Sequence, residues 1–111
     1  MKKWFCGTCG YVWDGENPPD KCPKCGATKD KFNLIPDDKA QLIDKSRLTN
    51  DLHMKLEAMM SKVIKLADKG IADNLDPACV LIFNQLKTDA AFAKQKIKAE
   101  IQTHISKGKW G

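Results

Sequence analysis

Two short cysteine loops, CGTC at residues 6–9 and CPKC at residues 22–25, lie 12 residues apart near the start of the chain. A gap of two residues lets both thiolates of one loop turn toward the same ion. Two such loops together supply four sulfur ligands to a tetrahedral site. A chance pairing of this kind within 25 residues is a poor explanation. We therefore predict one metal ion bound by Cys6, Cys9, Cys22 and Cys25, and we predict no catalytic residues.

The chain has 111 residues and five cysteines, of which four form the two loops and one, Cys79, stands alone. An odd number of cysteines argues against a disulfide scaffold and for a metal site with one spare thiol. The first cysteine loop lies where a signal peptide would need its apolar stretch, so we expect a cytoplasmic protein. No apolar run approaches the ~18 residues of a membrane span, so we expect no membrane association.

The composition divides the chain near Pro36. Residues 1–35 hold both cysteine loops and most of the turn residues, which favours short strands and turns. A module of ~35 residues cannot build a sufficient core, so metal binding must supply much of its folding free energy. Residues 36–47 are predicted to form a linker or a short helix, and residues 48–111 a helical hairpin. The fold class is thus a small metal-bound β and knuckle module followed by an all-α antiparallel hairpin.

Hydrophobic residues recur at helical spacing in the second part of the chain. The first stripe predicts a helix at about residues 48–69, which Gly70 ends as a C-terminal stop. The second stripe predicts a helix at about residues 77–107, with Asp76 as its N-cap and Pro77 as its first residue. The first stripe comprises Leu48, Leu52, Leu56, Met59, Val63 and Ala67, and the second comprises Cys79, Phe83, Leu86, Ala90, Ala93, Ile97, Ile101 and His104.

Two helices alone give little core for their length, so the hairpin is expected to need a further partner. We expect self-association into a four-helix bundle, which makes the protein a homo-oligomer. The alternative is that apolar residues on the far side of the second helix, Leu81 and Phe92, pack on the N-terminal module.

Residues 4–27, WFCGTCGYVWDGENPPDKCPKCGA, closely resemble the rubredoxin family. The short gap between the cysteine loops is most similar to the rubredoxin-like domain of rubrerythrins. The resemblance covers about residues 2–35, and it implies one iron bound by the four cysteines that cycles between its ferric and ferrous forms. It also implies an aromatic core that shields the iron, formed by Trp4, Tyr11, Trp13 and Phe32.

Cysteine spacing does not choose between iron and zinc, because both accept four thiolates. Four thiolates leave no open coordination position, so an iron site of this kind is expected to transfer electrons and not to bind substrate. Backbone N–H groups that donate to sulfur would stabilise the negative charge added on reduction. The expected donors are Thr8, Cys9, Gly10, Lys24, Cys25 and Gly26. The alternative function is a redox-silent zinc-ribbon adaptor whose helices bind a partner.

Rubrerythrins also carry a di-iron four-helix bundle, and this chain departs from that pattern because neither Glu57 nor Glu100 has a histidine three residues later. Peroxidase activity is therefore not expected. The pairs His53/Glu57 and Glu100/His104 are spaced as ordinary i, i+4 contacts on a helix. A second metal site in a dimer is the less favoured interpretation, and His104 is expected to be a hydrogen-bonded core or interface residue.

The charge of +5 is spread over both parts of the chain, without a dense basic run. Nucleic-acid binding would show a concentrated basic stripe, so no nucleic-acid partner is predicted. Lys24 lies in the second cysteine loop, and Lys2, Lys3 and Lys21 are near in sequence, which favours docking to an acidic redox protein. Cys79 is expected to be a buried, inert thiol, with a redox role as the alternative.

Overall fold

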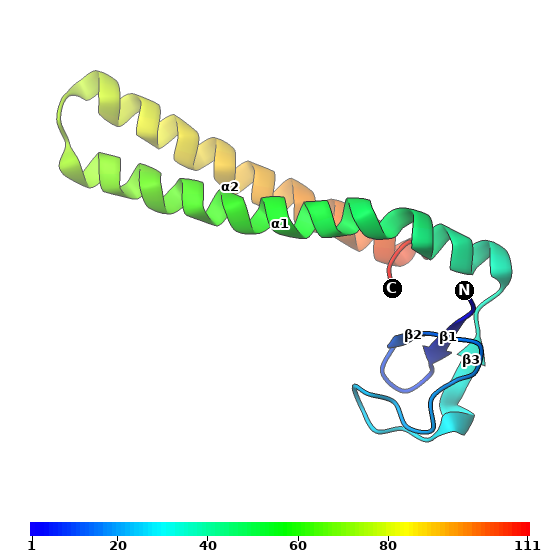
Figure 1. The fold of residues 1–111 in the computed structure, drawn as a ribbon. Helices are drawn as coiled ribbons and strands as arrows, with labels where there is room; N and C mark the ends of the chain where they lie inside the picture. Colours follow the sequence, from blue (N-terminus) through cyan, green and yellow to red (C-terminus); the bar gives the residue numbers. More distant parts are fainter. The chain divides into compact units, whose positions relative to one another are not determined.

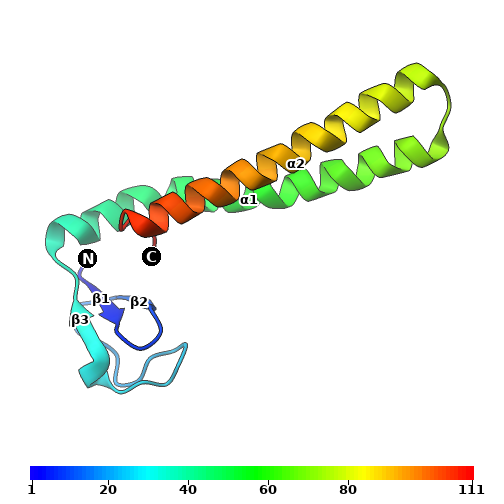
Figure 2. The same cartoon turned by 180° about the vertical axis from the view of Figure 1, so that it is seen from behind.

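The computed structural model describes all residues from Met1 to Gly111 and divides them into two compact units. The first unit contains residues 1–47 and 107–111, and the second contains residues 48–106. Figures 1 and 2 show a small sheet in the first unit and two long helices that lie side by side in the second. The predicted fold class is confirmed, while dimerisation stays a prediction. None of the helices is both apolar and long enough to span a bilayer.

The sheet has three antiparallel strands in the order β2-β1-β3, with β1 (Lys3–Cys6), β2 (Val12–Asp14) and β3 (Phe32–Leu34). Trp4 pairs with Trp13 across one side of β1, and Cys6 pairs with Phe32 across the other. A 3-10 helix, η1 (Lys29–Lys31), precedes β3. The central strand therefore delivers its last residue, a cysteine, into the middle of the module.

Helix α1 (Asp37–Asp73) is one continuous helix, so it begins well before the expected start near residue 48. Residues 37–47, which belong to the stretch expected to be a linker or a short helix, form the first turns of α1. Two of its side chains, Ala40 and Ile43, are each only 4% exposed, and packing within the first unit accounts for this early start. Two aspartates in the first turn, Asp37 and Asp38, match the helix dipole.

The expected stop at Gly70 is wrong, because α1 continues to Asp73. Asn74 takes the left-handed conformation with a φ of 51°, and its N–H donates to the Gly70 carbonyl at 3.2 Å. Gly70 serves close packing instead. A Cβ atom built there would lie 2.3 Å from Cε2 of Phe83 on the neighbouring helix, so a larger residue would require the Phe83 ring to shift.

Helix α2 (Pro77–Ser106) begins as the sequence predicts. The Asp76 side chain accepts the N–H of Cys79 at 2.8 Å, which confirms the N-cap. The predicted stripe of α2 is only partly buried, since Ala90 and His104 are its two buried members and Leu86 remains 45% exposed.

The predicted stripe of α1 mostly lies outside the hairpin. Ala67 is its one buried member, whereas Leu48 is 70% exposed and Met59 53% exposed. On α2, Leu81 and Phe92 are likewise exposed. The two helices thus meet along a different face of α1 from the one that its large hydrophobic residues define.

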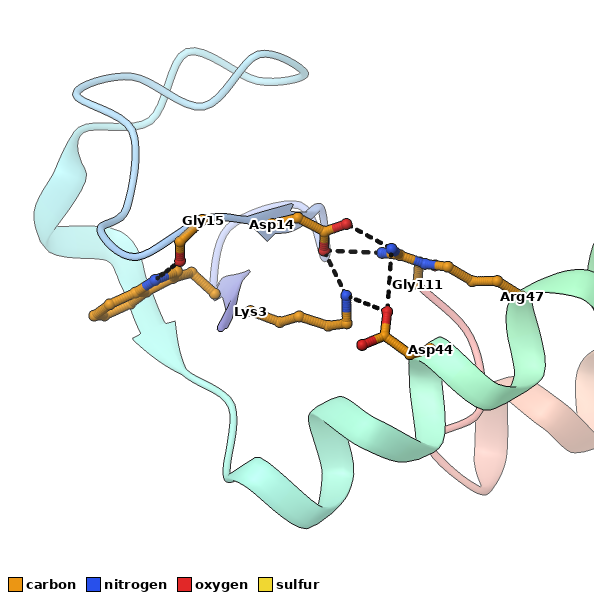
Figure 3. A network of polar contacts seen from close by, with 7 residues as sticks. Lys3, Asp14, Gly15, Asp44, Arg47 and Gly111 are labelled. Carbon is orange, nitrogen blue, oxygen red and sulfur yellow. Dashed lines mark hydrogen bonds and ion pairs between the residues drawn. The ribbon is translucent and has the colours of Figure 1, made fainter. Parts of the chain in front are cut away.

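A polar network joins the sheet to the start of α1 within the first unit (Figure 3). Lys3, the first residue of β1, is fully buried, and its Nζ atom lies 2.7 Å from Asp14 and 2.8 Å from Asp44. Arg47 donates to both carboxylate oxygens of Asp14, and its Nε donates to the Gly111 carbonyl at 2.9 Å. A buried lysine ammonium is tolerated here because two carboxylates face it.

Candidate metal centre

Two equivalent backbone turns present the cysteines. In the first turn the N–H of Gly10 donates to the Cys6 carbonyl at 2.8 Å, and in the second the N–H of Gly26 donates to the Cys22 carbonyl at 2.9 Å. Both glycines have a positive φ, 81° and 75°, which a residue with a Cβ atom rarely adopts. The positive φ of each turn therefore favours glycine directly after each cysteine pair.

The four cysteine sulfur atoms all lie within 4.8 Å of one another, and no other group of histidine, cysteine or acidic side chains forms such a cluster. The Sγ atoms of Cys6 and Cys25 are 3.8 Å apart, and those of Cys9 and Cys22 are 3.6 Å apart. A tetrahedral ion with metal–sulfur bonds of about 2.3 Å requires sulfur pairs about 3.8 Å apart. The four residues thus cluster to hold one metal ion, and this donor set fits iron and zinc alike.

Backbone N–H groups point at three of the sulfur atoms. The Cys6 sulfur accepts from Cys9 and Thr8, and the Cys22 sulfur accepts from Cys25 and Lys24. These four donors match the prediction. Gly10 and Gly26 do not, because their N–H groups are used by the carbonyls that close the turns. The N–H of Tyr11 donates to the Cys9 sulfur, a contact that cysteine spacing alone did not indicate.

These contacts set the acidity of the thiols. Burial raises the pKa of Cys22, but the N–H groups of Cys25 and Lys24 outweigh it and bring that pKa to about 7. Burial also raises the pKa of Cys6, but the N–H groups of Cys9 and Thr8 lower it, and the net effect is a lowered pKa. Tyr11 lowers the pKa of Cys9, while burial and the other three sulfurs raise it, with a net value of about 12. The first cysteine of each loop is thus prepared to be a thiolate ligand.

The sulfur cluster is unevenly covered. Cys6 and Cys22 are buried with Phe32, Cys9 is half-buried, and Cys25 is exposed. The expected aromatic core is confirmed by three further rings that pack against this buried group, namely Trp4, Tyr11 and Trp13. One ligand, Cys25, therefore connects an otherwise shielded centre to the surface.

The histidine and glutamate pairs of the hairpin have other roles. His104 is 7% exposed; its Nδ1 atom lies 2.5 Å from the Asn50 side-chain oxygen and its Nε2 atom 3.2 Å from Glu100. This is the hydrogen-bonded histidine that the sequence predicts. His53 contacts the His104 ring edge-to-face, and Glu57 forms ion pairs with lysines of α2.

Cys79 is half-buried, not buried as expected. The side chain of Asp76, which caps α2, raises the pKa of the Cys79 thiol, and burial adds to this. The neighbouring carboxylate therefore disfavours the thiolate form of Cys79.

The lysines near the cysteine loops separate into two kinds. Lys21 and Lys24 are exposed and have no ion-pair partner. Lys3, by contrast, is fully buried against two carboxylates, so it is not available for docking, and Lys2 lies 3.6 Å from Glu16. The burial of Lys3 corrects the expectation that this lysine takes part in docking, which rested only on its nearness to the cysteine loops along the chain.

Known proteins match the same segment. The family model of the rubredoxin-like domain of rubrerythrin matches residues 4–33. Reverse rubrerythrin-1 of Clostridium acetobutylicum is 55% identical over 38 residues, which cover 34% of this chain and 21% of that protein. Rubrerythrin of Nitratidesulfovibrio vulgaris is 46% identical over 33 residues, or 30% of this chain and 17% of its own length. No solved structure matches the chain significantly.

The match to one small rubredoxin extends over almost the whole length of that protein. Rubredoxin-1 of Alcanivorax borkumensis is 35% identical over 52 residues, which span 32% of this chain and 96% of that protein. The fold and the four-sulfur site thus define a rubredoxin-type metal-binding protein. The chain belongs to the rubredoxin family, and its N-terminal module is of the type found in rubrerythrins. It spans only about a fifth of the rubrerythrins that it matches, at 21% and 17% of their length.

Proposed function

We propose that the N-terminal module binds one iron ion through Cys6, Cys9, Cys22 and Cys25 and carries single electrons between redox proteins. The cluster of four sulfur atoms within 4.8 Å of one another supports this proposal most directly. When bound, iron supplies a one-electron change between its ferric and ferrous forms. Because four sulfur ligands complete a tetrahedral set, this assignment is to an electron carrier and not to a catalyst.

Backbone N–H groups of the chain favour the addition of negative charge at the sulfur atoms. The N–H donors to Cys6, Cys9 and Cys22 stabilise negative charge without moving, because each belongs to a closed backbone turn. Phe32 and the rings packed near it keep water from the buried sulfurs. Exposure of Cys25 gives a partner a short path to one ligand. The proposed face for electron exchange is therefore the surface around Cys25.

Metal analysis tests the iron assignment. Protein purified without oxygen from cells grown with both iron and zinc is expected to hold one iron per chain and to be coloured. Replacing all four cysteines by serine is expected to abolish the bound metal. A colourless preparation with one zinc per chain would replace this proposal with the zinc-ribbon adaptor.

The proposed partner is an acidic redox protein that docks at Lys21 and Lys24. These exposed lysines flank the second cysteine loop and are free of ion pairs. Small oxidants of opposite charge test this: ferricyanide is an anion, and hexaammineruthenium is a cation. Lys24→Glu is expected to slow oxidation of the reduced protein by ferricyanide severalfold and to speed oxidation by the cation.

The matched control is Lys65→Glu on α1, which changes the net charge equally but lies in the second unit. It is expected to alter both rates less than Lys24→Glu does. Added salt is expected to reduce the effect of Lys24→Glu, since exposed charges are screened. Equal effects of the two variants would contradict docking at Lys24.

A further inference from the structure

The hairpin has an unusual interior. Within residues 48–106 the buried side chains are those of Asn50, Ala67, Ala90 and His104, so no large aliphatic or aromatic side chain is buried there. Polar groups meet across the helices as well, since Lys94 lies 2.6 Å from Ser61 and 3.4 Å from Glu57. Burial of apolar surface is the main force that holds helices together. The contacts between α1 and α2 therefore bury little of the apolar surface that is needed to hold two long helices together.

Helix α1 carries two interleaved seams with heptad spacing. The inner seam faces α2 and comprises Asn50, His53, Glu57, Met60, Ile64, Ala67 and Ile71. The outer seam comprises Leu52, Leu56, Met59, Val63 and Leu66. Both follow the alternating three- and four-residue steps of a helix that packs on a neighbour. In the outer seam, Leu52 is 48% exposed, Leu56 47% and Leu66 65%. Helix α1 is thus patterned to contact two helices, and the hairpin provides only one.

The outer seam is large enough for a stable contact. Its side chains, together with the exposed Ile82 and Leu86 of α2, offer on the order of 500 Å² of apolar surface. Interfaces are about 60% apolar, and a stable dimer buries about 800 Å² per partner. The hairpin's exposed apolar surface therefore matches what one subunit brings to a dimer.

The spacing of the outer seam also matches a second copy of itself. Leu52, Leu56, Met59 and Val63 follow steps of four, three and four residues, a pattern that reads the same in both directions. We infer that two copies of this chain pair their α1 helices antiparallel along the outer seam, about a two-fold axis near residue 57. Leu56 then packs beside Met59 of the partner subunit, and Leu52 packs beside Val63 of the partner subunit. Together the two hairpins form a four-helix bundle.

This register has an electrostatic signature. It places Lys55 across from Lys62 of the partner subunit, on the edge of the seam away from α2. Both lysines are exposed and have no ion-pair partner within the chain. Like charges at such positions oppose pairing, and salt screens them. The dimer is therefore expected to strengthen as salt is added.

Sedimentation of the full chain over a range of concentrations tests the interface. The wild-type protein is expected to dimerise at micromolar concentration, and Leu56→Gln with Met59→Gln is expected to weaken the dimer at least tenfold. The control variants Leu81→Gln and Phe92→Gln remove apolar side chains that are 71% and 56% exposed on α2, outside the outer seam, and they are expected to leave the dimer intact. A wild-type chain that stays monomeric at 100 µM in high salt, or a dimer lost only in the control variants, would overturn the inference.

A charge-exchange cycle tests the register without disturbing apolar packing. Lys55→Glu and Lys62→Glu, made singly, each create pairs of opposite charge between the subunits and are expected to strengthen the dimer severalfold. The two changes together place glutamates opposite each other and are expected to return the dimer to its original strength. If both single changes weaken the dimer or leave it unchanged, the antiparallel pairing is wrong.

Discussion

The sulfur atoms of Cys6 and Cys25 lie 3.8 Å apart, yet Cys6 is fully buried and Cys25 is exposed. Cys6 ends the central strand of the sheet, and its sulfur accepts two backbone N–H groups. Cys25 belongs to the outer part of the second loop. Two ligands of one site thus lie in opposite environments. We assign a structural role to the buried Cys6 and contact with partners to the exposed Cys25.

This difference predicts unequal effects of ligand removal. Cys6→Ala and Cys25→Ala each lose one metal–sulfur bond, but Cys6→Ala also removes a fully buried side chain and the sulfur that accepts the N–H groups of Thr8 and Cys9. We expect Cys25→Ala to bind Zn²⁺ more tightly than Cys6→Ala, as measured by titration and by urea unfolding. Equal affinities would contradict the assigned roles.

The carboxyl group of Asp14 predicts a dependence of stability on acid. Hydrogen bonds from Arg47 lower its pKa, and Lys3 adds to this, so the pKa is about 2 in the fold compared with 3.8 for an unperturbed aspartate. Because the folded pKa is depressed, the stabilisation is fully present above pH ~5 and is lost as the pH falls toward 2. After screening by solvent, we expect Asp14→Asn to cost on the order of 1–2 kcal/mol at pH 7.

Urea unfolding of the wild-type protein and Asp14→Asn at several pH values measures this effect. The difference between the two unfolding free energies is expected to shrink as the pH falls from 5 to 2, and it vanishes only below pH 2, where the carboxylate is protonated in the folded state as well. Asp20→Asn, at an exposed aspartate of the same unit, is the control and is expected to follow the wild type. A difference that stays constant from pH 7 to pH 2 would refute the electrostatic role of Asp14.

The contact between Gly70 and Phe83 predicts that Gly70→Ala lowers stability when the Phe83 ring is present and raises it when the ring is absent. Gly70→Ala favours the helix by about 1 kcal/mol, but its methyl group meets the Phe83 ring, and overpacking costs roughly 1–3 kcal/mol. We therefore expect Gly70→Ala to lower the melting temperature in the wild-type chain. The same change is expected to raise it in a Phe83→Leu background, where the ring is absent. Stabilisation in both backgrounds would show that the ring moves aside freely.

Cys79 predicts slow alkylation that depends on Asp76. The carboxylate raises the thiol pKa, so little thiolate is present at pH 7. Asp76→Asn removes the charge, while asparagine is an equally good N-cap, so the helix is retained. We expect faster labelling of Cys79 by iodoacetamide in Asp76→Asn, followed by mass spectrometry of metal-loaded protein. The same rate in both proteins would assign the low reactivity to burial alone.

The cysteine loops and the start of α2 could be predicted because short-range rules decide them. Spacing indicates the four ligands, and Asp76 with Pro77 marks a helix start whatever surrounds it. The role of Gly70 could not be predicted, because it depends on Phe83 of the other helix, which sequence order does not reveal. The burial of Lys3 likewise depends on Asp44, a residue far along the chain. Long-range packing, and not local preference, decided each of these positions.

The hydrophobic stripe of α1 shows the same limit in another form. Periodicity correctly marked Leu52, Leu56 and Met59 as one side of a helix, but it could not say which partner covers that side. The structure shows α2 on a different face, lined by Asn50, Glu57 and other polar residues. A stripe of apolar residues thus indicates that one side of a helix contacts another element, but it does not identify that element.

Electron uptake by the isolated protein is the sharpest test of the proposed one-electron iron centre. Anaerobically purified protein is titrated with dithionite while its visible absorption is followed, and it is then reoxidised. We expect the uptake of one electron per chain, bleaching of the colour, and full recovery of the colour on reoxidation without loss of metal. A protein that carries one metal ion on its four cysteines but takes up no electron would contradict the proposed iron centre.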